Sequence, residues 1–164
     1  MITKKVQQAI NDQINEELYS SYLYLALAAH YEAMNLKGFG TWLQAQAQEE
    51  ISHAMKFYSF LIERGGTVSL QAIQQPPTKF PGADTAFRLA YDHERHITGR
   101  INALYELAKA QKDYAFEQFL HWFIDEQVEE EANTLEIAEI LDRIGSHEQA
   151  IFMLDAKLGA RKAE

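Results

Sequence analysis

The chain has no cysteine, and this absence excludes disulfide bonds, thiolate metal sites and a cysteine nucleophile. It also has no apolar run that approaches the ~20 residues of a membrane-spanning helix. The first residues, MITKKVQQAINDQ, contain no apolar segment of the kind that marks a secretory signal. We therefore expect a cytoplasmic protein with no membrane partner.

Positive charge is scarce, because 15 Lys and Arg residues stand against 24 Asp and Glu residues and leave a formal net charge of −9. An acidic surface repels nucleic acid and attracts cations, so nucleic acid is not an expected partner. Hydrophobic residues make up 47% of the 164 positions, which is enough for one sizeable core. The composition predicts a single domain over residues 1–164.

Residues that break helices are few, with 8 glycines and 3 prolines. Between them, apolar residues recur with the period of an α-helix, and no stretch alternates as a strand does. The pattern predicts four long helices and a short fifth, at about residues 3–33, 41–64, 85–112, 113–144 and 147–158. Met34–Gly40 is the expected turn after the first helix, and Gly65-Gly66 the expected end of the second.

Capping residues set the expected starts of the later helices. Asp84 or Thr85 is the expected N-cap of the third helix, and Asp113 that of the fourth. Ser146 and Gln149 together fit a capping box at the start of the fifth.

The connection at residues 65–83 contains all three prolines and no helical pattern. Fully extended, it spans up to ~60 Å, whereas the second helix is expected to be ~40 Å long. The connection can therefore return along the whole bundle, so that the third helix starts at the same end as the second. We predict an all-α four-helix bundle with one long crossover.

Each long helix has an apolar stripe, which is the face expected to be buried. Every stripe is interrupted near its middle by carboxylates or by related polar groups: Glu17, Glu50, His53, Glu94, Gln127 and Glu130. At a rise of ~1.5 Å per residue, these six positions fall at about one height in the predicted bundle. The four helices are therefore expected to contribute to one polar layer.

Four carboxylates in one buried layer repel one another, and each costs several kcal/mol to desolvate without a partner. No Lys or Arg lies near the layer on these stripes. The charge is tolerable if the groups are protonated, if water enters, or if two divalent cations balance it. Oxygen ligands with one imidazole suit iron or manganese, and in Glu50-x-x-His53 both side chains lie on one helical face.

Tyr24 lies two turns from Glu17 on the same stripe. It either hydrogen-bonds a ligand or donates an electron at the layer, or it is an ordinary core residue. The sequence pattern leaves these readings open.

The segments around the layer, NEELYSSYLYL, QAQEEISHAM, YDHERHIT and DEQVEEE, closely resemble those of the ferritin family, and specifically of bacterial non-haem ferritins. The resemblance extends over the whole chain. It implies a ferritin-like four-helix bundle with a short C-terminal fifth helix, assembled into a hollow cage of 24 subunits. It also implies iron storage, in which an intrasubunit di-iron ferroxidase centre oxidises Fe(II) with O₂ or H₂O₂ and ferric mineral is stored in the cage.

The resemblance further implies a role for each residue of the layer. Glu17, Glu50 and His53 correspond to ligands of a first iron. Glu50 is expected to bridge to a second iron held by Glu94 and Glu130, with Gln127 as a nearby hydrogen-bonding group. Tyr24 matches the family's tyrosine beside the centre. A third iron site in these ferritins corresponds to four residues: Glu49, Glu126, Glu129 and Glu130.

Two departures separate the chain from the haem-containing bacterioferritins. Those relatives repeat Glu-x-x-His on the fourth helix, where this chain has Gln127 to Glu130 without a histidine. Their haem-ligating methionine falls near Ser52 here, and Met55 is not at that position. No haem is therefore expected.

Three other readings stay open. One is a di-iron or di-manganese enzyme that acts on an organic substrate, and another is a structural bundle with a hydrated polar layer. A third is a DNA-protecting mini-ferritin, which the intrasubunit ligand set disfavours. The fifth helix carries Ile151, Phe152 and Leu154, which pack either on a neighbouring subunit or on the same bundle.

Overall fold

Helical periodicity in the sequence becomes five helices in the computed structural model, which describes residues 2–161. They are α1 (Lys4–Ala33), α2 (Lys37–Glu63), α3 (Ala83–Gln111), α4 (Tyr114–Ile144) and α5 (Glu148–Leu158). No strand occurs among the described residues, and the all-α prediction is confirmed. Over the same part of the chain, no helix has the length and apolar character needed to cross a membrane.

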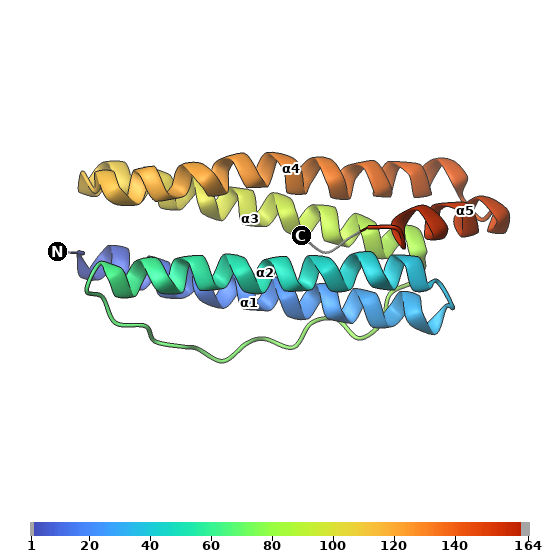
Figure 1. Ribbon diagram of the computed structural model, residues 1–164, viewed down its shortest axis with the longest axis horizontal. Coiled ribbons are helices and arrows are strands. Elements are labelled where there is room, and N and C mark those ends of the chain that lie inside the picture. The colour runs from blue at the N-terminus through green and yellow to red at the C-terminus, as the bar shows by residue number, and fades with distance from the viewer. Residues whose placement is uncertain (1, 162–164) are drawn as a thin grey trace.

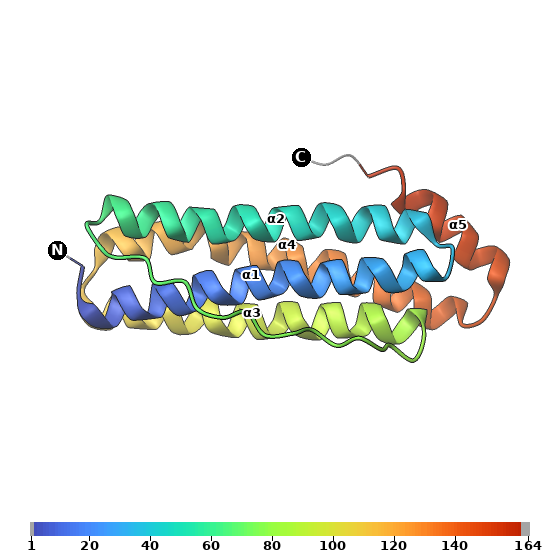
Figure 2. The ribbon, with the colours of Figure 1, turned by 90° about the horizontal axis from the view of Figure 1, so that it is seen from below.

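The four long helices form two antiparallel pairs, α1 with α2 and α3 with α4, and α1 also packs against α3 (Figure 1). The crossover at residues 64–82 runs along the outside of the bundle (Figure 2). It brings the start of α3 to the end at which α2 begins, as its length predicts. The four-helix bundle with one long crossover is therefore confirmed.

Polar side chains of α1 fix the crossover in place. The amide of Asn11 donates to the Thr67 carbonyl oxygen at 3.0 Å and accepts from the Ser69 backbone N–H at 2.7 Å. Further along, the amide of Asn15 donates to the Ala72 carbonyl oxygen at 3.2 Å. These bonds supply partners for backbone groups that have no helix or sheet to pair with. The crossover is thus a defined part of the fold.

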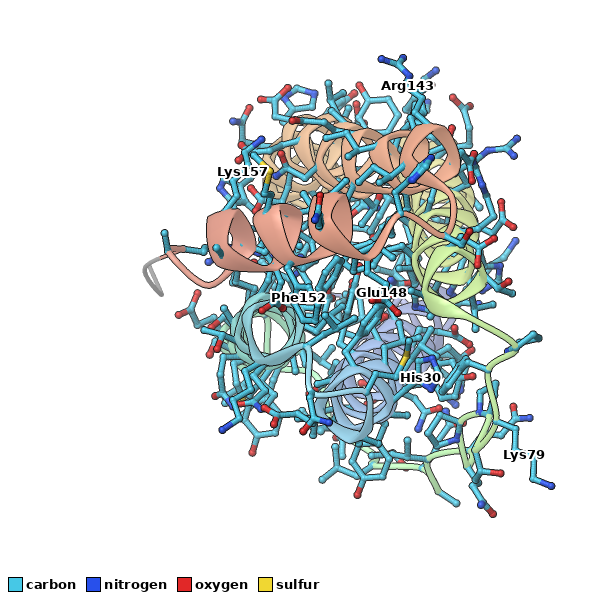
Figure 3. The ribbon with its side chains drawn as sticks, turned by 90° about the vertical axis from the view of Figure 1, so that its right-hand side faces the viewer. His30, Lys79, Arg143, Glu148, Phe152 and Lys157 are labelled. Atoms are coloured by element: carbon cyan, nitrogen blue, oxygen red, sulfur yellow. The ribbon has the colours of Figure 1, made fainter. Side chains whose placement is uncertain are left out.

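The short helix α5 lies across one end of the bundle and packs against α2 and α4 (Figure 3). Leu154 and Leu158 are buried there, while Phe152 is 58% exposed and Met153 is 75% exposed. Part of the apolar surface of α5 therefore packs on the chain's own bundle. The exposed pair remains the surface expected to meet a neighbouring subunit.

Three of the predicted helix boundaries are wrong. The turn at Met34–Gly40 is shorter than expected, because α2 already begins at Lys37. The N-cap of α3 is Gly82, and that of α5 is His147, neither of which makes a side-chain capping bond. The predicted cap at Asp113 is confirmed, since its carboxylate accepts from the Phe116 N–H at 3.2 Å.

Gly38 lies inside α2 because α5 packs on its backbone. A Cβ atom added at Gly38 would be 1.8 Å from the carbonyl oxygen of Asp155. The carboxylate of Asp155 also accepts a hydrogen bond from the Phe39 N–H at 2.9 Å. A sequence pattern alone suggests a turn at this glycine, whereas the structure shows a close helix–helix contact.

Gly38→Ala is expected to destabilise the protein by about 1–3 kcal/mol, because α5 must shift to admit the methyl group. Gly99→Ala is the matched control: it is exposed in α3, and a Cβ added there has no atom within 4 Å. Alanine there should stabilise the helix by about 0.5–1 kcal/mol. Denaturant unfolding of both variants measures the difference. Equal effects of the two substitutions would contradict the proposed contact.

The apolar core is divided into two clusters. One, nearer α5, includes Leu27, Phe39 and Phe87; the other, nearer the N-terminus, includes Ile10 and Phe57. Between them on every long helix lie the six polar residues that the sequence places in one layer: Glu17, Glu50, His53, Glu94, Gln127 and Glu130. The layer thus separates the two halves of the core.

Candidate metal centre

The six predicted layer residues all have buried side chains, with exposed fractions between 1% for Glu17 and Glu94 and 4% for His53, Gln127 and Glu130. They come from all four long helices. Helical spacing explains the placement, since each lies on the inward stripe of its own helix. The predicted burial of this layer agrees with the structure.

Glu17, Glu50 and His53 form one group of candidate ligands. One ligand atom from each lies within 4.8 Å of the others. His53 Nδ1 is 3.3 Å from Glu50 Oε2, as the three-residue spacing along α2 allows. Two carboxylates and one imidazole at this separation are a ligand set suited to a first-row transition metal.

A second group shares the same histidine. His53, Glu126 and Glu130 also offer ligand atoms within 4.8 Å of one another, and His53 Nε2 is 3.7 Å from Glu126 Oε1. In this conformation His53 joins the two groups, whereas the sequence resemblance assigns the bridging role to Glu50. The shared histidine places the two groups side by side in the bundle.

Glu94 belongs to neither three-residue group, because neutral neighbours hold its carboxylate. The Tyr24 hydroxyl donates to Glu94 Oε1, and the Gln127 amide donates to Glu94 Oε2 at 3.2 Å. Burial, followed by the charge of Glu94, raises the pKa of Tyr24 well above its ordinary value, so its phenol keeps its proton. The structure thus places Tyr24 at the layer as a hydrogen-bond donor.

Two buried amides that the sequence interpretation did not single out also contact the layer. Gln13 donates to Glu17 Oε1 at 2.8 Å, and Gln46 donates to Glu130 Oε2 at 2.5 Å. Gln13 precedes Glu17 by one helical turn, and Gln46 lies on the inward stripe of α2. That spacing is the signal that identifies them.

Within residues 2–161, Glu17 Oε2 and Glu50 Oε1 are buried carboxylate oxygens without a hydrogen-bond partner. A buried acceptor without a partner costs about 1–3 kcal/mol, and more if it is charged. Both atoms belong to the Glu17–Glu50–His53 group, where a cation would satisfy them together. This is the structural observation that most directly points to metal.

Burial and mutual repulsion favour the protonated carboxyls when no metal is bound. Burial first, and then the charges of Glu94 and Glu50, raises the pKa of Glu130 to about 10. Burial and the charges of Glu94 and Glu17 raise the pKa of Glu50 well above its ordinary value. Burial also raises the pKa of Glu17 and of Glu94. Cation binding at neutral pH should therefore release protons.

The metal-free protein is expected to lose stability as the pH rises from 7 to 9. Glu130 ionises near pH 4.5 in the unfolded chain but near 10 in the fold, so the folded state binds the extra proton between these values. The free energy of unfolding should fall by about 1.4 kcal/mol per pH unit for each such group.

The range from pH 7 to 9 is chosen to avoid His93, whose effect on stability changes with pH in the opposite direction to that of the carboxyls. Burial lowers the pKa of His93 from 6.5 to about 4, so stability that depends on its neutral form is lost as the pH falls below 6.5. Between pH 7 and 9 His93 therefore has no effect on the pH dependence of the melting temperature. A change in melting temperature over this window reports the buried carboxyls instead. A melting temperature that rises over this window would contradict the shifted carboxyls.

A further cluster of carboxylates lies on the outer side of the layer. Glu49, Glu126, Glu129 and Glu130, the residues of the predicted third site, all line one cavity of ≈ 490 Å³. Residues from α5 and the segment after it, including Lys157 and Arg161, line the same cavity. We call this cavity with its four carboxylates the outer site.

Known proteins resemble the chain over nearly its full length. A family model described as the ferritin-like domain matches residues 7–144. A bacterial non-heme ferritin of Bacteroides fragilis (strain 638R) is 39% identical over 161 residues, which cover 98% of this chain and 100% of that protein. One from Staphylococcus aureus (strain USA300) is 35% identical over 161 residues, covering 98% of this chain and 97% of that one.

Solved structures agree with these sequence relatives. A crystal structure described as a novel open pore ferritin from the hyperthermophilic archaeon Archaeoglobus fulgidus superposes with a TM-score of 0.98 at 45% identity. The match covers 99% of this chain and all of that one. A humanized archaeal ferritin gives a TM-score of 0.99 at 44% identity, covering 100% and 99% of the two chains.

Proposed function

The chain belongs to the ferritin family, whose fold and sequence relationships support iron storage, and from this premise we propose that the polar layer is its ferroxidase centre. Each subunit would oxidise Fe(II) to Fe(III) with O₂ or H₂O₂ and pass it to a stored ferric mineral. The observation that carries the proposal is the buried Glu17–Glu50–His53 group with its two unpartnered oxygens.

We assign the ligands as follows. Glu17, Glu50 and His53 hold the first iron, and Glu50, Glu94 and Glu130 hold the second. Glu94 must then exchange its hydrogen bonds from Tyr24 and Gln127 for a bond to iron, or share the carboxylate between them. The outer site, formed by Glu49, Glu126, Glu129 and Glu130, would take a third iron.

The redox balance of the reaction is simple. Two Fe(II) ions give up two electrons, and one O₂ takes them with two protons to form H₂O₂. When H₂O₂ is the oxidant, the same two electrons and two protons yield two waters. Four carboxylates around two substrate ions favour the higher oxidation state, because anionic oxygens attract Fe(III) more strongly than Fe(II).

The protein's own side chains fix the geometry for this reaction. Gln13 and Gln46 orient the carboxylates of Glu17 and Glu130 by neutral hydrogen bonds. Tyr24 donates a hydrogen bond to Glu94, and its raised pKa keeps the phenol protonated. The apolar clusters above and below exclude bulk water, which strengthens the attraction of the carboxylates for cations.

An iron-soaked crystal tests the assignment. Anomalous scattering is expected at two positions inside the bundle, one beside Glu17 and His53 and one beside Glu94 and Glu130. Iron found only on the outer surface would contradict the proposal.

Several broader features accompany this proposal. We propose that residues 1–164 act as one domain, that 24 copies form a closed cage, and that the protein works in the cytoplasm without haem. The exposed pair Phe152 and Met153 on α5 supports contact between copies. The organic-substrate and mini-ferritin readings receive no specific support from the ligand groups, which lie within one bundle.

A further inference from the structure

After α5 the chain makes a turn at residues 159 and 160. This turn brings Arg161 against the middle of α2, at Gln46 and Glu49. Arg161 is far from these residues in the sequence. Its side chain is 22% exposed and that of Glu49 is 25% exposed. The contact is thus a partly buried one at the mouth of the outer site.

Arg161 is held by three different groups of α2. Its guanidinium donates to both oxygens of Glu49, at 2.8 and 2.9 Å. A second nitrogen donates to Gln46 Oε1 at 2.8 Å. The guanidinium carbon also lies 4.6 Å from the centre of the Trp42 ring. One nitrogen, Nη2, therefore bridges both oxygens of Glu49 while Nη1 holds Gln46 and the guanidinium lies over an aromatic ring, a combination that the several donors of a planar guanidinium allow.

Gln46 also connects Arg161 to Glu130, one of the proposed ligands of the second iron. Because Arg161 occupies the amide oxygen of Gln46, the amide nitrogen faces Glu130 and donates to it at 2.5 Å. A continuous path of hydrogen bonds thus joins Arg161 to Glu130. Arg161 is therefore linked both to Glu49 in the outer site and, through Gln46, to Glu130 in the polar layer.

Charge explains what the guanidinium does at this place. The outer site gathers four carboxylates, and Arg161 supplies a fixed positive charge that is not lost at any pH the protein meets. The guanidinium contacts both oxygens of Glu49 and pairs its charge, so a metal that binds Glu49 competes with Arg161 for the same carboxylate. A cation that enters the outer site with Glu49 as ligand must first displace the guanidinium.

We propose that Arg161 is a built-in competitor of metal at the outer site, held as a latch by the segment after α5. The inner pair of iron positions fills with the latch closed. Metal at the outer site binds only when Arg161 leaves Glu49, which also frees Gln46 from its present orientation. The latch keeps the outer carboxylates paired until iron reaches them. This inference rests on the proposed function of the central layer.

The test is calorimetric titration of the assembled, metal-free protein with Zn²⁺ alone, a redox-inert probe of both regions. For the wild type we expect two tight sites per subunit and one weak outer site. Arg161→Gln should tighten the outer site about tenfold, since no charged hydrogen bonds then need to be broken, and leave unchanged the inner site beside Glu17 and His53, to which the Arg161–Gln46–Glu130 path does not lead. Arg161→Lys, which keeps the charge but lacks the second nitrogen that holds Gln46, should fall between the two.

Lys157→Gln is the matched control, because Lys157 lines the same cavity but pairs with Glu136 at 3.3 Å. It removes the same charge and should leave outer-site affinity at the wild-type value. The latch is disproved if Arg161→Gln binds like the wild type, loses affinity, or gains no more than Lys157→Gln. If no protein, wild type included, binds two tight Zn²⁺ per subunit, the proposed centre itself fails, which is a distinct outcome.

Discussion

Replacing Glu50 and His53 together by alanine is expected to lower the initial rate of aerobic Fe(II) oxidation more than about 100-fold. Loss of a partner that merely orients a metal ligand already costs about 10–100-fold, and this variant loses two ligands. The two residues also lie together, with 3.3 Å between His53 Nδ1 and Glu50 Oε2. Stopped-flow absorbance of the ferric product measures the rate.

The control for this experiment is another glutamate–histidine pair of the same chain. Glu16 and His96 lie 3.4 Å apart on the outside of α1 and α3, away from the layer. Glu16→Ala with His96→Ala should keep the wild-type rate, and gel filtration should show the same assembly for both double variants. If the Glu50 and His53 variant oxidises iron at the wild-type rate, the assignment of the centre is wrong.

Replacing Glu50 and Glu130 by glutamine is expected to stabilise the metal-free protein at pH 9 by about 1–4 kcal/mol, since an amide of the same shape is neutral without having to bind a proton. In the wild type these carboxyls must hold protons that the unfolded chain releases. The same variant should lose stabilisation by Zn²⁺, which for the wild type amounts to about 2.7 kcal/mol per site at 100 times the Kd.

Exposed glutamates provide the comparison. Glu106 and Glu139 have exposed side chains and pair only with neighbouring basic residues on their own helices. Changing both to glutamine removes the same charge but should alter stability by less than about 1 kcal/mol, and Zn²⁺ should stabilise that variant like the wild type. Thermal melts at pH 9, with and without Zn²⁺, measure the stability of the two double variants and of the wild type. A lower melting temperature for the Glu50 and Glu130 variant, with undiminished stabilisation by Zn²⁺, would contradict a costly acidic layer.

Much of the fold can be predicted from the sequence, because local patterns determine the long helices. Apolar stripes of period 3.6 give the four helices, and the side chain of Asp113 caps α4 as predicted. The acidic interruptions predict the layer for the same reason, since Glu17 and Glu94 each lie on an otherwise apolar face. Helix geometry alone then brings them to one height.

The features that sequence patterns miss all depend on contacts between distant residues. Gly38 resembles a turn residue until α5 packs against it through Asp155. The role of Arg161 is likewise invisible in the sequence, because its partner Glu49 lies 112 residues away. Neither contact leaves a periodic signal, so only the folded chain reveals them.

The division of the ligands between the two helix pairs has a consequence for how the protein matures. The α1–α2 pair brings Glu17, Glu50 and His53, while the α3–α4 pair brings Glu94 and Glu130. Each hairpin closes through contacts near in sequence, but the two come together only after the crossover has spanned the bundle. A half-made chain emerging from the ribosome therefore carries an incomplete set of ligands. On the proposed ligand assignment, oxidation at an iron pair would therefore begin only once the two hairpins have docked, because Glu94 and Glu130 arrive with the second hairpin.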